Sequence, residues 1–122
     1  MNKKSVLISL VLVVVVFSGI YLLFPQKYAD GALDSFAQCL AGKGITMYGA
    51  NWCPHCQNEK KAFGSSFKFV PYVECPEHPQ ACLSAGIEGY PTWIFTNGER
   101  LVGEQGIQKL SEKSGCTLPT KS

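Results

Sequence analysis

The chain has 122 residues, a formal net charge of +2 and six cysteines. The whole excess of positive charge comes from Lys3 and Lys4, because the other nine Lys and Arg are balanced by nine Asp and Glu. A domain of balanced charge lacks the basic surface that nucleic acid requires, which excludes a nucleic-acid-binding function. The length suits one small domain and an anchoring segment.

The N-terminal residues differ in composition from the rest of the chain. Residues 5–24 contain no charged side chain and are mostly Val, Leu and Ile. A helix of about 20 apolar residues crosses a bilayer, and lysines before such a span favour a cytoplasmic N-terminus. We therefore expect residues 1–24 to form a single-pass membrane anchor, with the remaining chain on the exoplasmic side, periplasmic or lumenal.

A cleaved signal peptide is the alternative interpretation of this segment. The apolar region of a signal peptide is usually about 7–15 residues long and ends at a cleavage site of small residues. The apolar run here is longer, and no clear site of that kind follows it, so an uncleaved anchor is favoured. Under either interpretation the rest of the chain is exported, and its even number of cysteines indicates disulfides.

The first half of the exported part divides into a linker, two helices and a strand. Residues 25–31 are predicted to be the linker. Apolar residues at helical spacing predict a helix over residues 33–41, and a run with Thr, Met and Tyr predicts a strand over residues 45–50. Residues 53–63 are predicted to be a helix with Pro54 in its first turn, where a missing N–H leaves no bond unmade.

A second strand and a short helix follow. Alternating apolar residues predict a strand over residues 67–75, in which Pro71 indicates a sheet edge or a bulge. Residues 79–85 suit one or two helical turns that begin at a proline.

A hairpin and a last helix complete the domain. The aromatic and β-branched run at residues 91–95 and the run at residues 100–102 flank Asn97-Gly98, a pair typical of tight hairpin turns. Residues 107–113 are predicted to be the last helix. The expected boundaries are residues 32–118 for the domain and residues 119–122 for a tail.

The segment Trp52-Cys53-Pro54-His55-Cys56 carries the chemistry. A thiol attacks a disulfide as its thiolate, and the free N–H groups at the start of a helix favour that anion. Cys56 lies one turn after Cys53 on the same helix face, so the two sulfurs can form a disulfide or resolve a mixed one. We predict Cys53 as the nucleophile, Cys56 as the resolving thiol and His55 as a group that adds positive character or a hydrogen bond to the thiolate.

Two other interpretations of this motif stay open at the level of the residues. It is half of a zinc site if Cys75, His78 or Cys82 completes the ligand set. The wide spacing of the second cysteine pair and the exported setting disfavour zinc. A purely structural disulfide is the other alternative. We predict no metal and no cofactor.

The sequence also resembles a known family. Residues 47–56, residues 71–75 with Cys82, and residues 85–93 resemble the thioredoxin superfamily, and more closely the thioredoxin-like domain associated with bacterial and plastid homologues of vitamin K epoxide reductase. The resemblance covers residues 33–115. It implies an α/β thioredoxin-like fold, with a central mixed β-sheet of about four strands flanked by helices, preceded here by one N-terminal transmembrane helix.

The resemblance also implies how partner chains bind. It implies that the Tyr90-Pro91 peptide bond is cis and faces Cys53 and Cys56, and that this loop offers backbone groups to the partner chain. Trp52 is expected to line the surface beside the thiols. Trp52, Tyr90 and Pro91 are therefore the predicted substrate-binding residues, while an ordinary turn before a strand is the alternative for Tyr90-Pro91.

The chain departs from the family in two ways. Many thioredoxins carry a buried acid six residues before the first reactive cysteine, and Met47 occupies that position here. Proton transfer then falls to water, His55, Glu59 or Glu74, among which the sequence does not choose. The chain also lacks the quinone-reducing helical bundle of fused homologues, so any such partner is expected to be a separate membrane protein.

Four further cysteines remain. The resemblance suggests a structural disulfide between Cys75 and Cys82, while a second redox pair that relays electrons to Cys53 and Cys56 is the alternative. Cys39 and Cys116 are expected to pair and tie the two ends of the domain together. If they do not pair, one of them is free to bond another chain.

These observations predict a membrane-anchored thiol–disulfide oxidoreductase that acts on thiols and disulfides of exported proteins. We expect it to be an oxidant, recycled by a quinone-linked membrane partner that resembles vitamin K epoxide reductase. The alternatives are a disulfide reductase that receives electrons across the membrane and a non-catalytic thioredoxin-like binding module.

Overall fold

The computed structural model describes residues 2–23 and 28–120. The N-terminal helix α1, Lys3–Leu23, contains a stretch, Lys3–Ile20, that is long and apolar enough to cross a membrane, although a signal sequence passes the same test. None of this stretch is buried inside the structure. The end of the predicted anchor and the start of the predicted linker, at residues 24–27, lie outside the described residues, as does the end of the predicted tail.

A mixed sheet of four strands forms the centre of the domain. β1 pairs in parallel with β2 and antiparallel with β3, and β3 pairs antiparallel with β4. The strands in spatial order are β2 (Tyr72–Glu74), β1 (Thr46–Gly49), β3 (Thr92–Ile94) and β4 (Arg100–Val102). The parallel pair requires a crossover, which the chain between β1 and β2 supplies as a helix.

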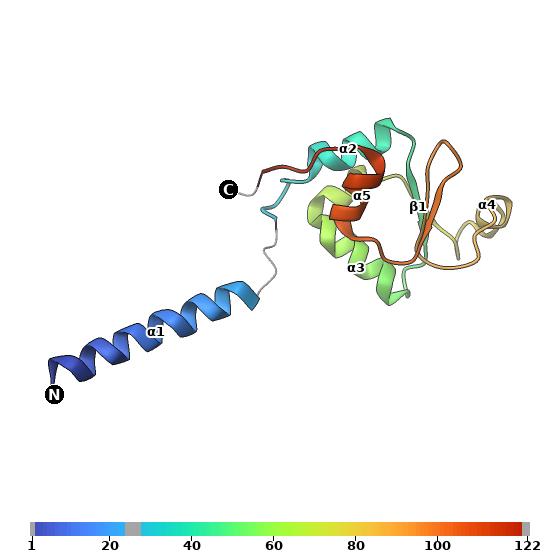
Figure 1. Ribbon diagram of the computed structural model, residues 1–122. Helices are drawn as coiled ribbons and strands as arrows, with labels where there is room; N and C mark the ends of the chain where they lie inside the picture. Colours follow the sequence, from blue (N-terminus) through green and yellow to red (C-terminus); the bar gives the residue numbers. More distant parts are fainter. Residues whose placement is uncertain (1, 24–27, 121–122) are drawn as a thin grey trace.

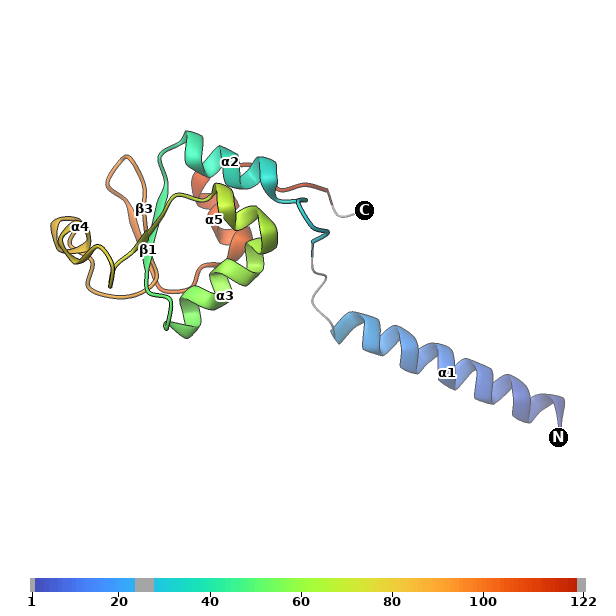
Figure 2. The same ribbon diagram turned by 180° about the vertical axis from the view of Figure 1, so that it is seen from behind.

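Helices lie on both sides of this sheet, as the predicted fold requires. Both views place α2, α3 and α5 on one side of the sheet and the short α4 on the other (Figures 1 and 2). The helices are α2 (Asp34–Gly42), α3 (Pro54–Phe63), α4 (Pro79–Ser84) and α5 (Gly106–Ser114). Each helix end lies within one residue of its predicted position, because apolar spacing and Gly or Pro punctuation are local signals.

The core fills the space between the sheet and the helices α2, α3 and α5. Met47 in β1 and Trp93 in β3 are paired across the sheet, and neither is accessible to solvent. The ring of Phe63 in α3 lies 6.1 Å from the ring of Trp93 and is stacked 5.7 Å from Phe36 in α2. These contacts pack α3 against the strands β1 and β3. The start of α3 therefore lies near the end of β1.

The prediction of one strand over residues 67–75 was wrong in its first half. Gly64–Phe69 is a 3-10 helix, η1, and only Tyr72–Glu74 is a strand. The ring of Phe67 packs edge-on against Phe63 at 6.0 Å and Tyr72 at 5.6 Å, so a helical turn rather than strand alternation places its side chain. β2 lies at the edge of the sheet, as Pro71 indicated.

Two disulfides join separate parts of the domain. Cys39 in α2 is bonded to Cys116 just after α5, across a sequence separation of 77 residues. Cys75 after β2 is bonded to Cys82 in α4, across a separation of 7 residues. The first disulfide therefore closes a loop that contains nearly the whole domain, and the second closes a short loop between β2 and α4.

Replacing Cys39 and Cys116 together by Ala should destabilise the domain more than the same change at Cys75 and Cys82. In the loop-entropy model the long loop contributes about 4.5 kcal/mol to the free energy of unfolding and the short loop about 2.5 kcal/mol. Urea unfolding of both double variants, compared with the unchanged chain, measures the two losses. An equal or larger loss at Cys75 and Cys82 would contradict the prediction.

Candidate active site

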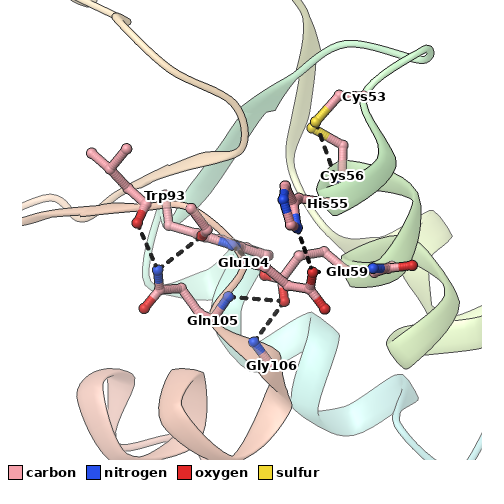
Figure 3. A network of polar contacts seen from close by, with 11 residues as sticks. Cys53, His55, Cys56, Glu59, Trp93, Glu104, Gln105 and Gly106 are labelled. Carbon is pink, nitrogen blue, oxygen red and sulfur yellow. Dashed lines mark hydrogen bonds and ion pairs between the residues drawn. The ribbon is translucent and has the colours of Figure 1, made fainter.

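The two remaining cysteines lie at the start of α3. Cys53 is the N-cap residue of α3 and has an extended backbone, and Pro54 follows in the first turn. The Sγ of Cys53 accepts a hydrogen bond from the backbone N–H of Cys56 at 3.2 Å (Figure 3). Cys53 and Cys56 are free thiols, and both are buried. The sequence motif therefore forms the predicted arrangement of two sulfurs within one helical turn.

The environment of Cys56 keeps it protonated at neutral pH. Burial, followed by the hydrogen bond with Cys53, raises the pKa of the Cys56 thiol to about 12. A backbone hydrogen bond from Ala50 and the positive charge of Lys60 act in the opposite direction. The helix start, with its free N–H groups, acts directly on the sulfur of Cys53.

His55 lies at the solvent-exposed side of this motif and has an acidic partner. Its Nδ1 lies 2.9 Å from Oε2 of Glu104, in the loop before α5. Asn58 donates a hydrogen bond to the same oxygen at 3.1 Å. These bonds lower the pKa of Glu104. The contact leaves only the Nε2 side of the imidazole for the thiols or a partner chain.

Glu104 is a site residue that sequence reasoning missed. It lies 49 residues after His55 and directly after Gly103, and neither feature indicates a contact with the motif. Only the packing of α3 against α5 brings the loop before α5 to His55.

Glu59, one of the predicted proton acceptors, is instead committed to structural contacts. Its carboxylate is 1% exposed and accepts a hydrogen bond from Nε1 of Trp93 at 2.6 Å. It also accepts the backbone N–H groups of Gln105 at 3.2 Å and Gly106 at 2.6 Å, at the start of α5 (Figure 3). Burial raises the pKa of Glu59, and these hydrogen bonds act against the rise. The carboxylate thus connects α3 to β3 and α5.

The predicted substrate-binding residues lie together near the thiols. Trp52 is 65% exposed, and its ring packs edge-on against the ring of Tyr90 at 5.9 Å. The Tyr90-Pro91 peptide bond is cis, and the ring of Pro91 is buried. Trp52 follows the end of β1, and Tyr90 precedes the start of β3. Because β1 and β3 are antiparallel and Tyr48 is paired with Thr92, both residues lie at the same end of these two strands.

The two cysteine donors of the alternative zinc site are engaged elsewhere. Cys75 and Cys82 are bonded to each other, so neither sulfur is available as a ligand. Among residues 2–23 and 28–120, no group of three or more His, Cys, Asp or Glu side chains is placed to hold a metal ion. The two disulfides together leave Cys53 and Cys56 as the free thiols in that part of the chain.

Comparison with known proteins gives several relatives. No family model matches the chain. It is 40% identical over 93 residues to "Thiol-disulfide oxidoreductase LTO1" of Arabidopsis thaliana, a match that covers 69% of this chain and 24% of that protein. It is 34% identical over 104 residues to "Thioredoxin domain-containing protein 5 homolog" of Drosophila melanogaster, which covers 74% of this chain and 24% of that protein. The chain thus spans about a quarter of the length of these curated relatives.

Two further comparisons concern an isomerase-like protein and a solved structure. "Protein disulfide isomerase-like 2-2" of Oryza sativa subsp. japonica is 35% identical over 82 residues, 56% of this chain and 22% of that protein. A thioredoxin of Malassezia sympodialis superposes with a TM-score of 0.45 and 24% identity, over 76% of this chain and 93% of that one.

Replacing Glu59 by Gln should destabilise the domain. An amide presents N–H donors to a site where all three partners are donors, and a buried polar group left unsatisfied costs about 1–3 kcal/mol. Urea unfolding measures the change, with the exposed Glu112→Gln as the control. A loss from Glu59→Gln no larger than that of the control would contradict the structural role.

The unchanged chain and Glu59→Gln together also test the raised pKa of Glu59. A carboxyl whose pKa is raised by folding contributes its stability fully below its unfolded pKa and loses it as the pH rises through its folded pKa. The advantage of the unchanged chain over Glu59→Gln should therefore shrink from acidic to mildly alkaline pH. If the difference in the free energy of unfolding between the two proteins grows with pH, folding lowers the pKa of Glu59 and the assigned direction is wrong.

Proposed function

Because the chain belongs to the thioredoxin superfamily, we propose that it is a thiol–disulfide oxidoreductase that acts through Cys53 and Cys56. The observation that carries the proposal is the hydrogen bond that the backbone N–H of Cys56 donates to the sulfur of Cys53 at the start of α3. The start of a helix offers free N–H donors to such a sulfur, and a second sulfur one turn later can displace a bound partner. The curated relatives named as oxidoreductase and isomerase-like proteins support the same chemistry.

The proposed cycle oxidises a dithiol. A substrate thiolate attacks the sulfur of Cys53 in the Cys53–Cys56 disulfide, and Cys56 leaves as a thiolate. A second substrate thiolate then attacks the substrate sulfur of the mixed disulfide, and Cys53 leaves. The substrate loses two electrons and gains a disulfide, while Cys53 and Cys56 end reduced. Trp52 and Tyr90 supply the aromatic surface that the substrate chain contacts next to Cys53.

The proposed setting is the exoplasmic side of a membrane. The apolar helix α1 serves as the single-pass anchor, with Lys3 and Lys4 on the cytoplasmic side. Two disulfides within one small domain support an oxidising compartment. The proposed substrates are therefore the thiols of exported proteins.

The proposed direction is oxidation, with a quinone-linked membrane partner that resembles vitamin K epoxide reductase and reoxidises Cys53 and Cys56. The hydrogen bond that the sulfur of Cys53 accepts at the start of α3 supports it, because stabilising the reduced form of a cysteine pair makes its disulfide a stronger oxidant. The competing proposal is a reductase fed with electrons across the membrane. A third proposal is a module that only holds a partner, without exchange chemistry.

Replacing Cys56 by Ser should trap mixed disulfides between Cys53 and substrate proteins, because the thiol that resolves them is lost. Non-reducing electrophoresis and mass spectrometry of the full chain, produced in an exporting host, detect them. The control Cys53→Ser should trap none of these partners. Partner binding that persists equally in both variants would favour the binding module over the enzyme.

The reduction potential of the Cys53–Cys56 pair should lie nearer to that of strong oxidants, about −120 mV, than to that of thioredoxin, about −270 mV. Equilibration of the full chain with glutathione buffers of known ratio, read by alkylation of the free thiols, measures it. A value near that of thioredoxin would support the reductase.

A further inference from the structure

The thiol of Cys56 needs a group that accepts its proton, if the proposed function holds. Cys56 is completely buried, and burial keeps its pKa far above neutral. To resolve a mixed disulfide on Cys53 it must lose its proton, and when it leaves from a disulfide it must gain one. Met47 stands where many thioredoxins carry an acid and has no proton to exchange.

Two of the acids and bases near the motif are committed elsewhere. The carboxylate of Glu59 is saturated by Trp93 and by the start of α5. The imidazole of His55 is largely exposed and paired with Glu104 on the outer side of α3.

Tyr72, in β2, lies on the other side of Cys56. An added Cβ on Gly49, in β1, would come within 2.9 Å of the Sγ of Cys56 and within 3.3 Å of the hydroxyl oxygen of Tyr72. The sulfur and the hydroxyl therefore approach the same bare face of Gly49. The absence of a side chain at this position lets the two groups lie near each other.

Tyr72 is in turn connected to a carboxylate. Its hydroxyl donates a hydrogen bond to Oε2 of Glu74 at 2.5 Å. The other oxygen, Oε1, accepts the backbone N–H of Asn51 at 2.7 Å, in the loop that leads to Cys53. Glu74 is only partly buried, so its carboxylate can exchange protons with solvent. The three groups form a path from the buried sulfur to the surface.

Lys60 completes the charged surroundings of Cys56. It lies one turn after Cys56 in α3, and its Nζ is 3.9 Å from the centre of the Tyr72 ring. Its positive charge favours the thiolate of Cys56. Among the described residues, Cys53 and Lys60 act on Cys56 from α3, and Tyr72 in β2 interacts both with Cys56 and with Glu74.

We propose that Tyr72 and Glu74 form the proton relay of Cys56, in place of the acid that is missing at position 47. As Cys56 attacks the mixed disulfide, its S–H bond breaks and its proton passes to the Tyr72 oxygen, directly or through one water. The Tyr72 proton passes to Glu74 and then to solvent. The Cys53–Cys56 bond forms, and the partner leaves as a thiolate with the electron pair of the broken disulfide.

A relay suits the chemistry of this tyrosine better than a base would. Burial and the bond to Glu74 raise the pKa of Tyr72, so its hydroxyl stays protonated at neutral pH. A protonated hydroxyl can accept one proton while it donates another. Glu74 acts on the sulfur only through Tyr72 and is a positioning residue as well as the final acceptor.

The test follows the reaction of the reduced full chain, in detergent, with dithiobis-nitrobenzoate. Attack by Cys53 releases one nitrothiobenzoate, and resolution by Cys56 releases a second, so absorbance separates the two steps. Tyr72→Phe keeps the ring over Gly49 and the contact with Lys60 but removes the hydroxyl. We expect an unchanged first step and a second step slowed by about 100-fold at neutral pH, the lower end of the usual contribution of a positioned acid–base group.

The pH profile distinguishes a relay from a structural role. Without the relay, resolution depends on the thiolate fraction of Cys56, so its rate in Tyr72→Phe should rise about tenfold per pH unit below the pKa of Cys56. The unchanged chain should show a shallower rise. Glu74→Gln should slow the second step in the same way. If Tyr72→Phe does not fold, the rate of the second step in Glu74→Gln is the measurement that tests the relay. The control Tyr48→Phe removes a hydroxyl from the opposite face of β1 and should change neither step.

The outcomes separate the relay from the proposed function. A first step that is absent in the unchanged chain would overturn the oxidoreductase and the relay with it. A normal first step with an unchanged second step and pH profile in Tyr72→Phe would overturn the relay alone. A slow second step in Tyr72→Phe with a normal one in Glu74→Gln would remove Glu74 from the path.

Discussion

The buried carboxylate of Glu59 is the interaction on which the arrangement of the site depends. It lies in α3 and accepts hydrogen bonds from Trp93 in β3 and from the backbone at the start of α5. A buried carboxyl group is tolerated only where hydrogen-bond partners surround it, so these hydrogen bonds favour one position of α3 against the sheet and α5. That position brings Cys53 to the end of β1, beside the exposed ring of Trp52 and the ring of Tyr90.

The titratable side chains around the two thiols lie on two sides of α3. On the outer side, His55 and Glu104 form an exposed pair, whose effect on the reaction is screened by water. On the inner side, Tyr72 lies beside the buried sulfur of Cys56 and donates a hydrogen bond to Glu74, and the lower dielectric there strengthens electrostatic interactions. The outer pair therefore suits contact with partners, and the inner pair suits control of the proton.

Local patterns predicted most of the fold and part of the site. The helix that starts at Cys53 follows from Pro54 and from apolar spacing, because helix start signals act within one turn. The strand prediction for residues 67–75 failed because alternation of aromatic residues does not say whether a strand or a 3-10 turn places them against Phe63. The contacts of Glu59 escaped prediction because its partners lie 34, 46 and 47 residues away.

The sequence by itself determined the apolar N-terminal helix, the order of helices and strands, and the placement of two cysteines one turn apart at a helix start. Capping, helical spacing and turn preferences act over a few residues, so they can be recognised in the sequence alone. The tertiary structure alone decided that Cys39 is bonded to Cys116, that Glu59 is structural, and that Tyr72 lies beside Cys56. Those outcomes depend on which surfaces the core brings together, and packing across distant segments leaves no local pattern in the chain.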